Sequence, residues 1–354
     1  MIVVCRYRKI MTIQEIDEVS VTILMDNSTD LLLTNSNHAS RPPLTKNEKF
    51  ILPLPVAEHG FSALVNIVID SENEKEKNNV NKNIKYKNNK IFLFDTGPSE
   101  NGVIHNADIF GIAFDQINGI ILSHGHFDHF TGLANILRRI LLSKQDNTTR
   151  IDLFVHPDAF LKRWEVYQNG ERTKMPLLNE EHLQELGALL HKNTGVMFLP
   201  SSDSPLLMLT GEIPRKTSFE KGFPFHYVEN QSGNEIKLVP DPLVRDDQAI
   251  VVNVRNNGLV ILTGCSHAGI INTIDYAKKA TGIDKVYAVL GGFHLPADGG
   301  IYEEAIEPTV KELLRIDPDY IVPCHCTGWK AINRIIETMP KKFLQSSVGT
   351  VFSF

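Results

Sequence analysis

Apolar and polar residues alternate over residues 19–27 and predict a β-strand with one buried face, because successive side chains of a strand point to opposite sides. Residues 91–97 form a continuous apolar run, which indicates a strand buried on both faces. Over residues 131–144 the apolar positions recur at helical spacing, so a helix is expected there. The same criteria predict strands at 60–70, 117–123 and 151–157 and a short helix at 105–112.

The second half of the chain repeats this rhythm from residue 247 onward. Two strands are joined by residues 255–258 (RNNG), a strong hairpin signal. Expected strand segments in this half are 248–254, 259–265, 285–295, 319–328 and 343–354, and expected helices are 268–282, 302–316 and 329–339. Both halves place strands first and strand–loop–helix units after them, and this pattern favours two sheets sandwiched between helices.

Three segments depart from the pattern. Residues 71–90 are rich in Asn and Lys, so we expect a flexible insertion that buries too little to offset its ordering entropy. Residues 158–245 mix helix-like and turn-rich pieces, and we expect an elaboration beside the core that walls the substrate side. Residues 1–10 are expected to be a loose extension. The whole chain, 1–354, is interpreted as one domain carrying these additions.

Composition restricts the function classes. The 354 residues carry a net charge of −6 without a basic stripe, so no nucleic-acid partner is expected. Apolar runs fall short of the roughly 18 residues of a membrane span, and the N-terminal apolar stretch is too short for a secretory signal. Four widely spaced cysteines are typical of a reducing compartment. We therefore expect a cytoplasmic protein, and the sequence leaves its oligomeric state open, with a homo-oligomer as one alternative.

The densest group of candidate ligands lies in residues 122–133, LSHGHFDHFTGL. His124, His126, Asp128 and His129 follow a predicted strand and precede a predicted helix. Imidazole nitrogens and carboxylate oxygens are ligands that zinc and similar divalent ions accept. A sharp loop can turn the first two histidines toward one ion and the next two residues toward a second, and two ions about 3.5–4 Å apart can share a nucleophilic hydroxide. The alternative is a histidine-rich surface turn.

Loops at the ends of later strands offer further ligands, since functional groups gather in such loops. His267 and His325 are the favoured ligands among them. His294 is expected either to coordinate an ion, to face the substrate or to support a ligand. The remaining candidates are Cys265, Asp246 and Asp247.

A family resemblance rests on these residues. FDTG (residues 94–97) and LSHGHFDHFTGL resemble the signature of the metallo-β-lactamase superfamily. AEHGFS, TGCSHAGIINTI, GGFHLP and PCHCTG resemble one branch, named for dihydropterin-methyl-ribofuranosylaminobenzene-phosphate synthase, an enzyme type of methanopterin biosynthesis. The resemblance runs from about Val19 to the C-terminus and is loosest across residues 158–245. It implies an α/β fold, a four-layer αββα sandwich of two mixed sheets with the metal site at one edge.

The resemblance also implies a ligand set. The first ion would be bound by His124 and His126, and the second by Asp128, His129 and His325. Asp95 would steady the motif loop by contacting its ligands. Zinc is the expected metal, although manganese and iron accept the same ligands.

The chain departs from the superfamily pattern at two ligand positions. Cys265 stands where many members carry a bridging Asp, and its thiolate could bridge two ions or stay buried and inert. Where many members carry a further His, either Asp247 replaces it or His267 reaches in from the next loop, and we favour His267. The number of ions, one or two, therefore stays open.

Asn27, Glu58 and His59 are expected to bind the substrate together with His294, the alternative being that they cap turns and form surface hydrogen bonds. Asp128 and His294 are the expected catalytic residues. By resemblance the chain is a transferase that acts on a phosphorylated small molecule of pterin type and displaces diphosphate to form a C–N bond. The alternatives are a hydrolase of phosphoesters, lactones or thioesters that uses a metal-bound hydroxide and, less favoured, a non-catalytic metal-binding protein.

Overall fold

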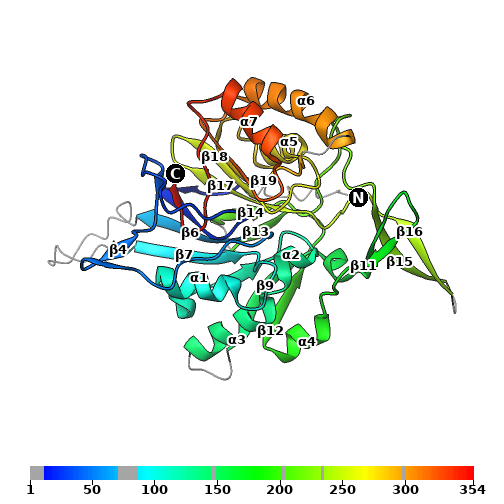
Figure 1. The fold of residues 1–354 in the computed structure, drawn as a ribbon, viewed down its shortest axis with the longest axis horizontal. Helices are drawn as coiled ribbons and strands as arrows, with labels where there is room; N and C mark the ends of the chain where they lie inside the picture. Colours follow the sequence, from blue (N-terminus) through cyan, green and yellow to red (C-terminus); the bar gives the residue numbers. More distant parts are fainter. Residues whose placement is uncertain (1–11, 71–86, 145–148, 201–203, 233–234, 297–299) are drawn as a thin grey trace, which may run out of the picture.

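Two large β-sheets face each other between two layers of helices in a computed structural model of the chain (Figure 1). The structure describes residues 12–70, 87–144, 149–200, 204–232, 235–296 and 300–354. Both sheets are mixed, with parallel and antiparallel neighbours. The predicted four-layer sandwich is therefore confirmed.

The first sheet has eight strands in the order β12-β9-β8-β7-β6-β2-β21-β3. Four neighbouring strands, from β12 to β7, run parallel, and the others are antiparallel. Their bounds are β2 Glu18–Met25, β3 Ala39–Ser40, β6 Ser62–Asp70, β7 Lys87–Phe94, β8 Gly119–Ile121, β9 Ile151–Val155, β12 Ala188–Lys192 and β21 Val351–Ser353.

The second sheet has seven strands, six of them in the order β13-β14-β17-β18-β19-β20, and β1 pairs with β17. The strands β18, β19 and β20 run parallel to one another. Bounds here are β1 Glu15–Ile16, β13 Met197–Leu199, β14 Leu207–Leu209, β17 Ala249–Val254, β18 Gly258–Thr263, β19 Val286–Gly292 and β20 Tyr320–Cys324.

Helices cover the outer face of each sheet (Figure 1). One outer layer contains α1 Gly102–Phe110, α3 Leu133–Lys144 and α4 Glu180–Glu185, and the other contains α5 Ile270–Thr281, α6 Gly300–Ile316 and α7 Trp329–Thr338. Shorter elements are α2 Phe127–Phe130, the 3₁₀ turns Phe114–Gln116 and Pro157–Phe160, and the hairpin of β4 Thr45–Lys46 and β5 Lys49–Phe50.

Strand periodicity explains how the layers hold together. In β17, Ile250 and Val252 belong to the apolar cluster between the sheets, whereas Ala249 and Val251 pack against the helices on the other face. All four side chains are buried, because a strand with helices on one side and a sheet on the other has no solvent-exposed face. Burial of apolar surface on both faces is the main stabilisation of such a sandwich, and each Å² removed from water contributes about 25 cal/mol to the free energy of folding.

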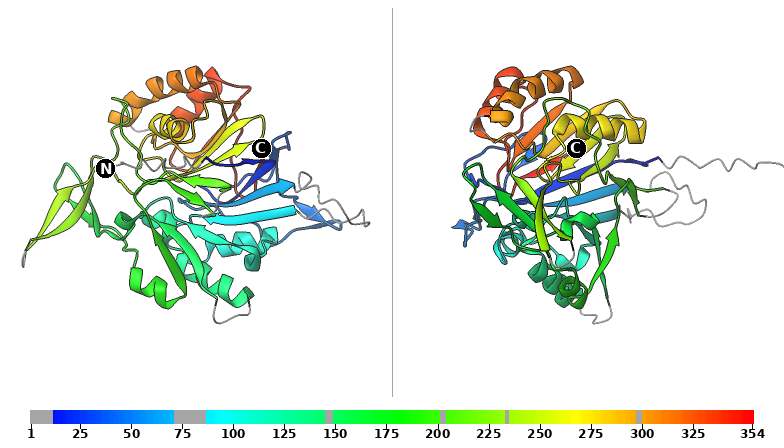
Figure 2. Two further views of the ribbon diagram at one scale, coloured as in Figure 1. Left: turned by 180° about the vertical axis from the view of Figure 1, so that it is seen from behind. Right: turned by 90° about the vertical axis from the view of Figure 1, so that its right-hand side faces the viewer.

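The sequence suggested that residues 158–245 lie beside the core, but part of this segment belongs to the core sheets. The strands β12, β13 and β14 from this segment extend the two main sheets at their edges. The rest forms a separate four-stranded antiparallel sheet that projects from one end of the sandwich (Figures 1 and 2). Its strands are β10 Arg163–Val166, β11 Arg172–Lys174, β15 His226–Ser232 and β16 Glu235–Pro240. Three-residue strands such as β13 carry too few alternating positions to be recognised from the sequence.

The last four residues of the insertion expected at 71–90 belong to a strand. Residues 87–90 belong to β7, which pairs with β6 from Asp70↔Lys87 onward. The backbone ladder thus continues into a polar sequence that offers no hydrophobic pattern. Residues 71–86 and the extension expected at 1–10 lie outside the described residues. Among the helices that the structure describes, none combines the length and apolar character needed to cross a membrane.

Candidate metal centre

Candidate ligands converge where the parallel strands of both sheets end. Asp95 follows β7, His124 lies shortly after β8, Cys265 follows β18, and His325 follows β20. In α/β sheets the carboxyl ends of parallel strands are where ligands bind, because side chains from several loops meet there. The topology thus assembles one site from segments that are far apart in the sequence.

One group of donors is formed by Asp128, His129, Cys265 and His325, whose ligand atoms all lie within 4.8 Å of one another. The Nε2 atom of His129 is 3.1 Å from the Sγ atom of Cys265, and that sulfur is 3.3 Å from Nε2 of His325. An oxygen of Asp128 lies 3.5 Å from His129 Nε2 and 3.4 Å from His325 Nε2. All four residues are buried.

A second group is formed by His124, Cys265 and His267, again within 4.8 Å. The Nε2 atoms of His124 and His267 are 3.2 Å apart. Ligand nitrogens that share one tetrahedral zinc ion at 2.0–2.1 Å are separated by about 3.3 Å, so this spacing fits a common ion. Cys265 belongs to both groups, and its sulfur therefore occupies the position of an atom that could bridge two ions.

Asp95 and Ser123 determine which nitrogen of two histidines faces the site. The carboxylate of Asp95 accepts hydrogen bonds from Nδ1 of His129 and from the backbone N–H and hydroxyl of Ser123, each at 2.7 Å. Because the Ser123 hydroxyl donates to Asp95, its oxygen accepts from Nδ1 of His124 at 2.9 Å. With Nδ1 protonated in both rings, the lone pair of each neutral imidazole is on Nε2, the nitrogen that faces the other donors.

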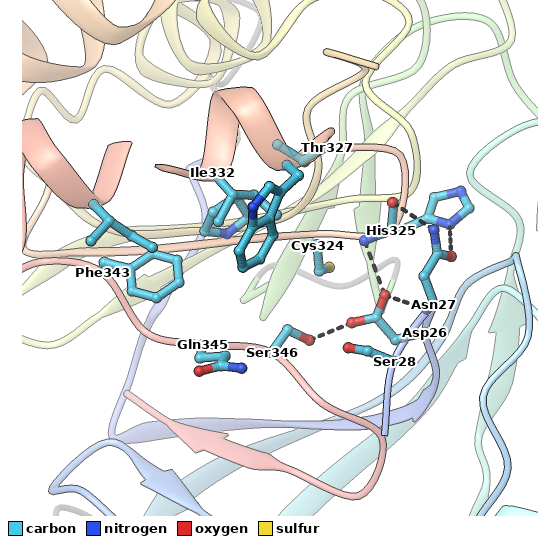
Figure 3. Close-up of a pocket in the computed structure, with 13 residues that line it drawn as sticks. Asp26, Asn27, Ser28, Cys324, His325, Thr327, Ile332, Phe343, Gln345 and Ser346 are labelled. Carbon is cyan, nitrogen blue, oxygen red and sulfur yellow. Dashed lines mark hydrogen bonds between the residues drawn. The ribbon is translucent and has the colours of Figure 1, made fainter. Parts of the chain in front are cut away.

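His325 is oriented by residues of the loop after β2. The Nδ1 atom of His325 donates to the side-chain oxygen of Asn27 at 3.2 Å, and the Asn27 amide donates to the His325 carbonyl at 2.9 Å (Figure 3). Asp26 accepts from the backbone N–H of His325 and from the Ser346 hydroxyl. These bonds leave Nε2 of His325 as the unprotonated nitrogen that faces Asp128 and Cys265.

Strained backbone marks the same edge. Asp95, Ser266, His294 and His325 all have a positive φ, between 45° and 59°, although none of them is glycine. Left-handed conformations of non-glycine residues cost of order 1 kcal/mol each and cluster at functional sites, where the surrounding contacts hold them. At His325 that restraint comes from the backbone N–H, which donates to Asp26, and from the backbone carbonyl, which accepts from the Asn27 amide.

Burial and charge set the protonation states. Burial lowers the pKa of His124, His126 and His267 well below the usual range, and the neighbouring histidines lower it further. The pKa of the Asp128 carboxyl is held well below its usual value by His129 and His325, although burial opposes this shift. The pKa of His129 is raised to about 9 by the carboxylates of Asp128 and Asp95, again against the effect of burial.

This donor set fits a divalent metal ion. Neutral imidazoles, one carboxylate and one cysteine sulfur are the ligands of zinc and related ions. In the first group the raised pKa keeps a proton on Nε2 of His129, the nitrogen that faces Asp128 and Cys265, and a divalent ion would take the place of that proton. Burial raises the pKa of the Cys265 thiol well above its usual range, and a bound ion would offset that cost by stabilising the thiolate.

The structure places the other predicted ligands differently. Asp246 accepts from the backbone N–H of Gly125 at 2.7 Å and pairs with Arg163, so it fixes the loop between His124 and His126. The carboxylate of Asp247 accepts from the backbone N–H of Ala268 at 2.8 Å. Of the two alternatives left open by the sequence, His267 and not Asp247 lies beside His124.

Cys265, His294 and Cys326 form a third group with ligand atoms within 4.8 Å of one another, so His294 lies where it could coordinate an ion as well. His126 belongs to none of the three groups. Its Nε2 atom lies 3.2 Å from Nε2 of His226, a buried residue that sequence reasoning missed. His226 stands in FPFHY, 100 positions away, with no other candidate ligand close by in the sequence that could have drawn attention to it.

The residues predicted to bind substrate lie around this centre. Asn27 also contacts Nδ1 of the exposed His59 at 3.2 Å, and the rings of His59 and His325 are 5.4 Å apart. Glu58 accepts from the Ser99 hydroxyl at 2.7 Å. The ring centre of His294 lies 4.1 Å from that of His267, with the two ring planes inclined at 51°. The Nε2 atom of His294 is 3.3 Å from the Tyr302 hydroxyl.

A cavity of about 280 Å³ opens beside Asp26, Asn27 and the main chain of His325 (Figure 3). Trp329, Ile332 and Phe343 form its apolar wall, and Ser28, Gln345 and Ser346 contribute polar groups.

Comparisons with known proteins agree with the fold. The chain is 31% identical over 306 residues to the 7,8-dihydropterin-6-methyl-4-(β-D-ribofuranosyl)-aminobenzene-5'-phosphate synthase of Methanocaldococcus jannaschii, covering 84% of this chain and 90% of that protein. It is 28% identical to an uncharacterized protein of the same organism, covering 83% of this chain and 93% of the relative. The family described as anti-Pycsar protein Apyc1 matches residues 70–185.

Among solved structures, Tm1679, a metal-dependent hydrolase of the β-lactamase superfamily, superposes with a TM-score of 0.63 at 21% identity. The match covers 95% of this chain and 98% of Tm1679, so it shows a shared fold over nearly the whole length. The resemblance seen in the sequence is thereby confirmed: the chain is an enzyme of the metallo-β-lactamase fold and belongs to the family of the dihydropterin-methyl-ribofuranosylaminobenzene-phosphate synthase.

Proposed function

We propose that the protein is a metal-dependent transferase that joins a dihydropterin carrying a methylene diphosphate to the amino group of a phosphorylated ribosyl-aminobenzene. The observation that carries the proposal is the buried convergence of Asp128, His129, Cys265, His267 and His325 with His124 at one edge of the sandwich. The substrate class is taken from the related Methanocaldococcus jannaschii synthase, whose named product links these two parts.

In the proposed step the amine lone pair attacks the methylene carbon, a C–N bond forms, and the C–O bond to diphosphate breaks with its electron pair. The amine then loses one proton. Divalent ions bound by the two donor groups would neutralise the charge that develops on the departing diphosphate. Zinc is the proposed metal, with manganese and iron as alternatives, and the position of Cys265 in both groups supports two ions.

His294 is the proposed acceptor of the amine proton. Its Nδ1 atom is buried without a hydrogen-bond partner among the described residues, and Tyr302 holds the ring through Nε2. A free lone pair beside the proposed ions is what a general base requires. Asp128 would act at the reacting centre as a ligand, and Asn27, Glu58 and His59 would contact the polar groups of the substrate from the loops after β2 and before β6.

A second candidate is a hydrolase that attacks a phosphoester, lactone or thioester. The motif His124-x-His126-x-Asp128-His129 and the fold shared with Tm1679 favour this alternative, because that protein is named a metal-dependent hydrolase. Under either proposal the substrate is a small molecule, and a cytoplasmic location without a nucleic-acid partner remains our prediction.

The test is a coupling assay with purified protein loaded with zinc, manganese or iron. A dihydropterin-methyl diphosphate and the ribosyl-aminobenzene phosphate are supplied together, and the coupled product and diphosphate are quantified. The transferase proposal expects equimolar product and diphosphate, and both should disappear after chelation. His294→Gln should lower kcat on the order of 10²-fold with the metal content unchanged.

Three other outcomes decide against the proposal. Release of phosphate or ring-opened lactone from generic substrates, without coupled product, would establish the hydrolase. Product formation that is insensitive to chelation would remove the role of the metal. Metal binding without turnover of either substrate class would leave a non-catalytic metal-binding protein.

A further inference from the structure

His226 is a buried histidine from outside the sandwich that reaches the metal centre. It is the first residue of β15, in the four-stranded sheet of β10, β11, β15 and β16, and its side chain is fully buried. Its backbone is held by the ladder pairing with Glu165 and by a hydrogen bond from its N–H to the carbonyl of Phe223 at 3.2 Å. The ring is therefore fixed in position before any ligand binds.

Hydrogen bonding determines the tautomer of His226. Its Nδ1 atom lies 2.8 Å from the backbone carbonyl oxygen of Asp241, and a carbonyl can only accept. The Asp241 carboxylate, 3.4 Å from the same nitrogen, is also an acceptor. Nδ1 thus carries the proton, and the lone pair of the neutral ring is on Nε2. A backbone carbonyl on Nδ1 is the arrangement that commonly orients a metal-binding imidazole.

That lone pair points at His126. The two Nε2 atoms are 3.2 Å apart, close to the separation of about 3.3 Å expected for two nitrogens on one tetrahedral ion. The ring of His126 lies 4.7 Å from the ring of His267 and 4.5 Å from that of His124. His126 and His226 therefore form a second pair of facing nitrogens beside the pair of His124 and His267.

We propose that His226 is a metal ligand and that it binds a divalent ion of the zinc class together with His126. This inference rests on the metal centre of the proposed function and adds a donor from a part of the chain that the superfamily signature does not include. It gives the small sheet a chemical role, because β15 carries a donor to the centre. This sheet is then required for metal binding.

A purely structural role predicts a different response. If Nε2 of His226 only accepts a hydrogen bond from Nε2 of His126, any side chain with an acceptor in the same place will substitute for it. Glutamine retains an acceptor oxygen but is a poor ligand for zinc-class ions, whereas cysteine loses the ring and supplies a strong ligand. The pair His226→Gln and His226→Cys therefore separates coordination from hydrogen bonding.

The experiment is a titration of metal-free protein with Co²⁺, which reports its ligands through its absorption spectrum. Wild type, His226→Gln, His226→Cys and the control His182→Gln are compared, since His182 is half-exposed on α4 and lies outside both donor groups. Folding is checked by thermal unfolding. We expect His226→Gln either to bind Co²⁺ at least tenfold more weakly or to bind one ion fewer per chain. The control should match the wild type in both affinity and stoichiometry.

His226→Cys should retain Co²⁺ and gain thiolate-to-cobalt charge-transfer absorption beyond that from Cys265. This variant also decides the matter if His226→Gln does not fold. Two results would overturn the inference and leave the proposed function intact. One is a folded His226→Gln protein with the affinity, stoichiometry and spectrum of the wild type. The other is a folded His226→Cys protein without added charge-transfer absorption. A wild-type protein that binds no ion would overturn both.

Discussion

The Oδ2 atom of Asp95 lies 2.7 Å from Nδ1 of His129, and both side chains are completely buried. The same carboxylate binds Ser123, whose hydroxyl in turn accepts from His124. One residue after β7 thus orients a ligand in each of the two donor groups. Because this contact fixes the nitrogen that faces the site, Asp95 should control metal affinity without touching a metal ion.

Replacing Asp95 with Asn tests that relationship. The amide retains one acceptor oxygen for three donors, so His124 and His129 lose their fixed orientation. We expect 10–100-fold weaker zinc affinity in a folded protein, which is the usual range for residues that orient a metal ligand. Competition with a chromophoric chelator measures it. Asp284→Asn, at a position 97% exposed, is the control, and equal affinities in the two variants would contradict the assigned role.

The buried ion pair of Arg163 and Asp246 should hold the motif loop in place. Asp246 bridges Arg163 and the backbone N–H of Gly125, and both charged side chains are almost completely buried. Arg163→Met leaves an uncompensated buried carboxylate and should cost about 3–5 kcal/mol in free energy of unfolding. Asp246→Leu should be similarly costly.

A double-mutant cycle provides the control for this prediction. The combined Arg163→Met and Asp246→Leu protein should be less destabilised than the sum of the two single variants, because neither charge is then left alone. Urea unfolding of metal-free protein measures all four states. Additive effects would show that the two residues do not act as a pair.

Glu220 should make stability depend on pH. Burial raises its pKa from the ordinary 4.5 to about 7, although the backbone N–H groups of Ile271 and Asn272 lower it. A raised carboxyl pKa means that the folded state binds the proton more tightly. The resulting stabilisation, about 3 kcal/mol, is fully present below pH 4.5 and is lost as the pH rises to 7.

Glu220→Gln removes that titration. The free energy of unfolding of the wild type, relative to the variant, should therefore fall between pH 4.5 and 7 and stay constant outside that window. Urea unfolding at several pH values measures the difference, and the slope is the readout because the substitution also alters hydrogen bonds at the start of α5. A difference that does not vary with pH would contradict the raised pKa.

Metal removal should lower thermal stability. Only the folded chain brings His325, Cys265 and Asp128 together, so an ion stabilises the folded state by mass action, by about 2.7 kcal/mol at a concentration of 100 times the Kd. Scanning calorimetry with chelator and then with excess zinc measures the effect. His325→Ala should show a smaller zinc-dependent shift than the wild type, and an equal shift would place the ion elsewhere.

Much of the architecture could be predicted because the strands carry strong periodicity. The segments 248–254 and 259–265 match β17 and β18 within two residues, since a strand that packs on both faces has a continuous apolar run between polar turns. The short strands β13 and β14 could not be recognised, because three residues show no period. Strand β7 begins at Lys87 through backbone pairing alone, which leaves no hydrophobic signal in the sequence.

The part of the candidate site that could be predicted consists of residues in compact motifs at the ends of strands. His124, Asp128 and His129 share one loop and helix, and His325 lies between two cysteines after an apolar strand. His226 had no such context, because it reaches His126 only through the fold of a separate sheet. The choice between Asp247 and His267 likewise depended on which side chain the backbone directs toward His124.

Crystals of the zinc-loaded protein, measured by anomalous diffraction at the zinc absorption edge, test the metal centre most directly. We predict one anomalous peak among Asp128, His129, Cys265 and His325 and a second beside His124, His267, His126 and His226, and both should be absent below the edge. Anomalous peaks confined to surface histidines, or no peak within coordination distance of Cys265 and His325, would contradict it.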